Sequence, residues 1–152
     1  MKPFRLRTRI TIVAFILLLA APLALSAQGR DGIGLGIMVG EPTGVSVISW
    51  LGGGNALDLV AAWSFAEPGS FYLHADYQFH GFVERPLTLF SGIGGFILLQ
   101  DQPVLGLRIP FGVSFLFQQA PLDLFLEVAP GITFVQGTDF FVGGGIGFRF
   151  YF

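Results

Sequence analysis

The chain has 152 residues with a formal net charge of −2, and it is 53% hydrophobic but only 12% charged. A water-soluble domain would carry about twice that share of charged residues, so the composition argues against an ordinary soluble fold. The length suits one domain, and the absence of Cys excludes disulfides and thiolate metal sites.

The first 27 residues have the order of a secretory signal peptide. An apolar run over residues 10–25 follows a group of basic residues, Lys2, Arg5, Arg7 and Arg9. The run contains Pro22 and is shorter than the roughly 20 residues of a spanning helix. We therefore predict a cleavable signal peptide over residues 1–27, to within a residue, and a mature domain over residues 28–152. A retained helical anchor is the alternative.

The mature segment carries a net negative charge. It contains all ten acidic residues of the chain but only four basic ones, Arg30, Arg85, Arg108 and Arg149. These arginines are scattered along the sequence and form no basic stripe for a phosphate backbone. Nucleic acid is therefore not expected as a partner.

Large apolar residues occupy every second position in a succession of short segments after the signal peptide. In chain order, the strands that this period predicts cover residues 33–39, 45–50, 57–65, 71–80, 87–98, 105–117, 122–134 and 142–152. Seven connectors rich in turn-forming residues separate them. A membrane strand needs only about 9 to 11 residues. The pattern predicts an all-β protein, an eight-stranded antiparallel up-and-down transmembrane β-barrel.

Some of these segments depart from a regular strand. The second is short, and the fifth loses its alternation around residues 91–95, where we expect a bulge or a bend. Pro110 and Pro130 each remove a hydrogen-bond donor, which suggests bulges or strand ends. The first and last segments have glycine on the face opposite their large side chains. Paired in a closed barrel, these glycines would form a seam that tolerates tight curvature and accommodates bulky inward groups opposite them.

Eight polar residues fall on the face that would line the lumen: Asp58, His74, Asp76, His80, Arg108, Asp123, Glu127 and Arg149. A barrel of eight strands is only wide enough to be filled by side chains, and buried charges need partners. We therefore expect a structural lumen network in which the two arginines pair with some of the carboxylates. A narrow polar channel or proton path is the alternative.

No catalytic residue, cofactor site or metal site is expected. His74 and His80 lie six positions apart on one strand, roughly 20 Å at about 3.3 Å per residue, too far to share a metal ion. The glycine-rich stretch at residues 143–147 is followed by neither Lys nor a helix-forming segment, which argues against nucleotide binding. A lipid-modifying enzyme would need a nucleophile and a base at the membrane edge, and the inward phase of both His residues disfavours it.

The glycine-rich start of the mature segment and its aromatic end suggest a family. The sequence GIGLG at residues 32–36 leads into GEPTG at 40–44, and the chain closes with GFRFYF at 147–152. With these features the chain resembles the small OmpA-like outer-membrane barrels, specifically the eight-stranded family common in spirochaetes. The terminal aromatic residues resemble the sorting signal of the outer-membrane barrel-assembly machinery, with Phe148, Phe150 and Phe152 as its key positions.

The resemblance implies export through the general secretory route and a place in the cell outer membrane, with outer-membrane lipid and the assembly machinery as partners. Members of such families tether membranes, bind hosts or modify lipids, so the fold does not choose an activity. We expect a non-enzymatic barrel with a structural or surface-interaction role, and keep a narrow channel and a lipid-modifying enzyme as alternatives.

Acidic residues in the connectors, Glu41, Glu67, Asp101 and Asp139, give one end of the expected barrel a surface that could meet a basic extracellular protein. A soluble periplasmic barrel that binds a ligand inside, as lipocalins do, is a further possibility. It requires the Phe-rich face to point inward, and the charges are too few to coat the outside.

Overall fold

The computed structural model describes residues 32–64, 69–84, 86–135 and 137–152, so the expected signal peptide lies outside the described residues. Among the described residues, no helix has the length and apolar character to cross a membrane. The predicted all-β class is confirmed by nine antiparallel strands: β1 (Ile33–Glu41), β2 (Gly44–Gly52), β3 (Asn55–Ser64), β4 (Ser70–Glu84), β5 (Leu87–Leu99), β6 (Val104–Arg108), β7 (Phe111–Leu116), β8 (Leu122–Thr133) and β9 (Phe140–Tyr151).

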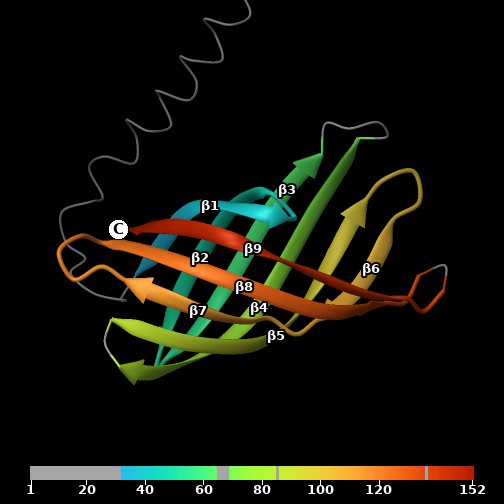
Figure 1. Cartoon of the computed structure of the whole chain (residues 1–152). Helices are drawn as coiled ribbons and strands as arrows, with labels where there is room; N and C mark the ends of the chain where they lie inside the picture. Colours follow the sequence, from blue (N-terminus) through green and yellow to red (C-terminus); the bar gives the residue numbers. More distant parts are fainter. Residues whose placement is uncertain (1–31, 65–68, 85, 136) are drawn as a thin grey trace, which may run out of the picture.

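The strands form one sheet that closes on itself. From β1 to β5 each strand pairs with the next in the chain, and β8 pairs with β9. The first and last strands also pair, with Gly34 opposite Tyr151 and Met38 opposite Gly147. Because β6 and β7 each lie between β5 and β8, the nine strands occupy eight positions of a ring. Figure 1 shows β6 and β7 at opposite ends of this shared position.

The break between β6 and β7 lies at Pro110, where the sequence suggested a strand end. The Pro110 carbonyl still accepts a hydrogen bond from the Gly92 amide at 2.9 Å. The same expectation was wrong for Pro130, because β8 continues through it in register with β9. The Pro130 carbonyl accepts a hydrogen bond from Ile109. The N–H and C=O of one residue in an antiparallel strand point to the same neighbour, so the side of Pro130 that lacks a donor faces the break between β6 and β7. No regular ladder needs a donor there.

Of the bulge or bend expected around residues 91–95, the bulge is absent from β5. The register between β4 and β5 is regular from Phe71 opposite Leu99 to Phe82 opposite Thr88, and its one shift lies between Phe82 and Glu84. The alternation is lost only in the sequence, because Ser91 and Gly95 occupy outward positions that hold large apolar residues elsewhere. The short second strand was also wrong in length, since β2 reaches from Gly44 to Gly52.

Alternate residues face the inside and the outside of the ring, as the period of two predicted. Each strand exposes at least one large apolar side chain outward, while the inward set contains the buried polar residues. In β4, Phe71, Leu73 and Phe79 are exposed, whereas His74 and Asp76 between them are buried. The charged strand residues whose side chains the structure describes are all buried inside the ring, except Glu41 at the end of β1.

Inward glycines lie directly opposite inward aromatic residues on the neighbouring strand. The paired residues are Gly34 with Tyr151, Gly112 with Phe90, Gly106 with Phe96, Gly147 with Phe125 and Gly131 with Phe141. A Cβ atom on each glycine would lie 2.2 to 2.7 Å from the ring of its partner. The expected glycine seam between the first and last strands therefore exists. Inward glycines opposite aromatic rings also occur on β6, β7 and β8.

Candidate functional site

The eight polar residues predicted to line the interior all point into the ring. Seven of them are no more than 1% exposed, and His80 is 9% exposed. They come from strands that lie on different sides of the ring, with Asp58 on β3, His74, Asp76 and His80 on β4, Arg108 on β6, Asp123 and Glu127 on β8, and Arg149 on β9. The interior is therefore a place where charges from distant parts of the sequence meet.

Arg149 crosses the interior from β9 to reach β2 and β3. Its Nη2 atom lies 2.8 Å from Asp58 Oδ1, and its Nε atom donates to Ser46 Oγ at 2.8 Å. The guanidinium carbon lies 3.8 Å from the ring centroid of Phe125. The other carboxylate oxygen of Asp58 accepts a hydrogen bond from Gln78 Nε2 at 3.3 Å. These contacts satisfy both oxygens of Asp58 and place a full positive charge beside it.

Arg108 forms a second cluster, which joins β4, β6 and β8. Its guanidinium makes an ion pair with Glu127, and its Nε atom lies 3.2 Å from Asp76 Oδ2. Its Nη1 atom donates to the Tyr72 hydroxyl at 3.2 Å and to His74 Nδ1 at 2.8 Å. Two carboxylates, a phenol and an imidazole thus surround one buried cation, which is the kind of partnering that a buried guanidinium requires.

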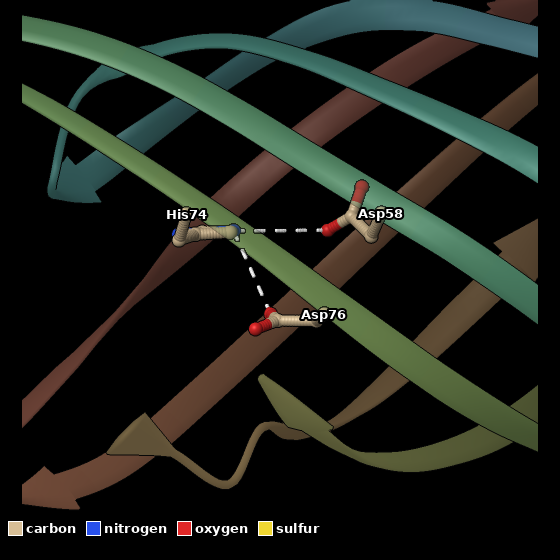
Figure 2. Close-up of side chains that lie close together, drawn as sticks. All are labelled: Asp58, His74 and Asp76. Atoms are coloured by element: carbon tan, nitrogen blue, oxygen red, sulfur yellow. Dashed lines mark ion pairs between the residues drawn. The ribbon is translucent and has the colours of Figure 1, made fainter. Parts of the chain in front are cut away.

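His74 lies between the two clusters. Figure 2 shows its imidazole with one nitrogen directed toward both Asp58 and Asp76. This nitrogen, Nε2, is 3.6 Å from Asp76 Oδ2 and 4.0 Å from Asp58 Oδ2. Because Arg108 can only donate, the Nδ1 atom of His74 must accept, and the hydrogen of the neutral ring then sits on Nε2. His74 therefore presents a donor to the two carboxylates.

The same three residues, Asp58, His74 and Asp76, bring one possible metal-ligand atom each to within 4.8 Å of one another. Two features disfavour a metal ion between them. The Nε2 atom has no free lone pair while Arg108 donates to Nδ1, and the guanidinium of Arg108 already lies against Asp76. Cation repulsion and the wrong tautomer would both have to be overcome, so the geometry fits a hydrogen-bonded structural cluster better.

The remaining predicted residues lie toward the end of the ring that holds the C-terminus. His80 Nε2 lies 3.0 Å from Gln78 Oε1, and the His80 ring packs against Trp50 and Phe90 with centroid distances of 4.6 and 5.1 Å. Asp123 accepts a hydrogen bond from the Tyr151 hydroxyl at 3.0 Å. The chain of contacts from His80 through Gln78 to Asp58 joins this end to the Arg149 cluster.

Four members of the network were not among the eight predicted residues: Ser46, Tyr72, Gln78 and Tyr151. All four are inward by the period of two, which is the signal that could have found them. The prediction named only the inward Asp, Glu, Arg and His residues, whereas a buried guanidinium also needs neutral hydroxyl acceptors.

The proposed assembly residues lie at the end of the last strand. Phe148 and Phe150 point outward from β9 and are 45% and 36% exposed. Phe152 follows the strand, and its ring centroid lies 5.3 Å from that of Phe150. Of the acidic connector residues, Glu41, Asp101 and Asp139 are exposed, whereas Glu67 lies outside the described residues, as do Arg30 and Arg85.

An open cavity of about 540 Å³ occupies the end of the ring away from the C-terminus. Its walls come from the turn between β1 and β2 and from the adjoining ends of β3, β4, β5, β6, β8 and β9. In Figure 1 the turns from β5 to β6 and from β8 to β9 lie at this end. None of the eight predicted polar residues is among its lining residues. The buried network reaches the cavity wall through Tyr72, whose hydroxyl accepts a hydrogen bond from Arg108.

Comparisons of the chain with protein-family models, with curated proteins and with solved structures found no match.

Proposed function

We propose that the mature chain is a transmembrane β-barrel of a bacterial outer membrane, with its lumen filled by side chains and with a structural or surface-interaction role rather than an enzymatic one. The observation that carries this proposal is the inverted distribution of polarity in the ring. Large apolar side chains are exposed on the outside, while Arg108, Arg149 and their carboxylate partners are at most 1% exposed inside.

This distribution would be unfavourable in water. Soluble monomers rarely expose a contiguous apolar surface larger than a few hundred Å², and burial of charges requires compensating partners. In lipid both arguments reverse, because the apolar belt is solvated by acyl chains and the charges are kept away from them. A closed sheet also leaves no unpaired strand edge in the hydrocarbon, as a membrane-spanning structure requires.

The outward aromatic residues give further support. One group lies near the open end: Trp63, Phe71, Phe134 and Phe140. Another lies near the end that holds the C-terminus: Phe79, Phe115, Phe117, Phe148 and Phe150. Two aromatic girdles with an aliphatic band between them are typical of the two interfaces of a membrane barrel. Strands of 12 residues, such as β8 and β9, are long enough for a tilted crossing.

The filled interior favours a plugged barrel over the two alternatives. Arg108, Arg149, Phe125 and Tyr151 all lie inside at 1% exposure or less, and side chains in these positions occupy the lumen of a ring of this size. A channel would need a continuous aqueous path, and a lipid-modifying enzyme would need its base at the lipid-facing surface. His74 is buried inside the ring, which leaves neither alternative with a specific supporting observation.

The test is the location and the gel mobility of the full-length chain produced in a diderm bacterium. We expect it in the outer-membrane fraction, with a band that migrates differently before and after boiling in detergent, because a closed ladder of backbone hydrogen bonds resists unfolding by detergent alone. A periplasmic protein whose mobility is the same in both samples would refute the proposal.

A further inference from the structure

The cavity at the open end of the ring has a largely apolar wall. Phe96 and Leu98 of β5, Val104 of β6 and Phe141 of β9 line it, together with Ala62 and Pro42. Its volume of about 540 Å³ falls within the range of small-molecule sites, about 300 to 1,000 Å³. The cavity can therefore hold a compact organic molecule.

Three aromatic residues of the cavity wall, Tyr72, Phe96 and Phe141, form a continuous group, and the Tyr72 hydroxyl accepts a hydrogen bond from Arg108 of the buried network. The Tyr72 and Phe96 rings are stacked with centroids 5.4 Å apart, and Phe141 meets Phe96 edge to face at 4.7 Å. Phe96 and Phe141 lie over Gly106 and Gly131, where a Cβ atom would come within 2.3 Å of each ring. The backbone thus fixes this aromatic floor in place, and such a preorganised surface suits ligand binding.

The described residues at this end of the ring carry negative charge. Among the described residues that line the cavity, Glu41 is the only one with a charged side chain. Asp101 and Asp139 lie exposed in the neighbouring turns. Arg108 donates a hydrogen bond to the Tyr72 hydroxyl, but Glu127 and Asp76 both pair with its guanidinium, so Arg108 adds no net positive charge near the cavity. A concave site with charge of one sign concentrates ligands of the opposite sign.

We propose that this cavity binds a small organic cation, an ammonium group carried on an apolar body. The apolar body packs against Phe96, Leu98 and Val104, and the ammonium group is held by the Glu41 carboxylate and the faces of the aromatic residues. This inference deepens the proposed surface role. It rests on the proposed function only in one respect, namely the side of the membrane from which the ligand reaches the cavity. The cavity itself is formed by the folded ring and is present whether or not the ring lies in a membrane.

The test is calorimetric titration of benzyltrimethylammonium into the protein folded in a nonionic detergent, with protein-free micelles as the blank. We expect saturable binding that Glu41→Gln weakens about tenfold. The matched variant Asp101→Asn removes the same charge from the same end but does not line the cavity, and it should change affinity by less than about twofold. Val104→Phe fills the cavity without changing its charge and should abolish binding.

Three results would overturn the inference: no saturable binding, equal losses in Glu41→Gln and Asp101→Asn, or equally tight binding of the anion 4-tert-butylbenzoate. The gel shift and cell fractionation on the same protein test the proposed function separately. A heat-modifiable outer-membrane protein that does not bind the ammonium refutes the cavity site alone, whereas saturable binding by a periplasmic protein refutes the membrane proposal alone.

Discussion

Arg108 and Arg149 are the basic residues of the described segments, and both are buried at 1% exposure or less. Each is tied to carboxylates on other strands, Arg149 to Asp58 and Arg108 to Asp76 and Glu127. Loss of one partner from a buried pair leaves an uncompensated charge, which is more harmful than loss of both. We therefore expect replacement of either arginine to lower the free energy of unfolding by more than a typical single substitution does.

Arg149→Met should lower the free energy of unfolding by about 3–5 kcal/mol, because Asp58 remains buried without its cation. The double variant Arg149→Met/Asp58→Asn should lose less than the sum of the two single losses. Urea unfolding of the protein in detergent, followed by Trp fluorescence, measures both. Asp101→Asn, at an exposed turn, serves as the control and should stay within about 0.5 kcal/mol of the parent. Strict additivity of the two single changes would contradict the coupling.

At the scale of the strands, the repeated contact is an aromatic ring lying over the glycine directly opposite it. Phe125 covers Gly147 in this way between β8 and β9. The ring fills the space that a side chain on the glycine would occupy, and it shields the backbone there. This contact explains why glycine is frequent on an inward face that is otherwise densely filled.

Gly147→Ala should destabilise the ring by about 1–3 kcal/mol, since the new Cβ atom would lie 2.4 Å from both the Phe125 ring and the Ile37 carbonyl oxygen. Gly81→Ala is the matched control, because Gly81 is also a strand glycine and has no atom within 4 Å of its Cβ position. Unfolding midpoints of the two variants give the comparison. Equal midpoints would mean that the aromatic contact contributes nothing.

The strands themselves could be predicted because the period of two is a local property of the sequence. It identified the eight inward polar residues, whereas the break at Pro110 was suggested by the hydrogen-bond donor that proline lacks. It failed at Ser91 and Gly95, where small outward residues hide an alternation that the structure maintains. The argument from the missing proline donor failed at Pro130, because it depends on which neighbouring strand the residue faces, and the sequence alone does not show that pairing.

The partners inside the ring could not be predicted from the same pattern. Arg149 and Asp58 lie on β9 and β3, which are not adjacent in the sheet. Their contact depends on how the ring closes and on the direction of each long side chain. The cavity was missed for the same reason, since its wall combines the ends of several strands, and no single segment of the sequence carries its signature.

For the molecule as a whole, the proposal of a membrane location makes the effect of a surface charge depend on depth. Leu126 near the middle of β8 and Leu51 near the end of β2 are similarly exposed, at 51% and 58%. In a bilayer, an arginine at the midplane is unfavourable by about 2–4 kcal/mol, and one near the interface by only about 0–1 kcal/mol. In water the two positions would be equivalent.

Leu126→Arg should therefore destabilise the protein in lipid vesicles by about 2–4 kcal/mol, and Leu51→Arg by no more than about 1 kcal/mol. Reversible unfolding from vesicles in guanidinium chloride measures the difference. If both variants stay within about 0.5 kcal/mol of the parent, as surface changes in a soluble protein do, the outward face does not contact lipid.

The pairing of β1 with β9 also governs the order in which the chain can fold. Gly34 meets Tyr151 only after the last strand has been synthesised, so every shorter nascent chain carries two open edges of unpaired N–H and C=O groups. Such edges invite pairing with other chains, and contacts between distant residues form slowly because a long loop must close first. Pairing of the final strand with β1 therefore closes the sheet. Until that pairing forms, the chain must be kept apart from other copies of itself to avoid aggregation.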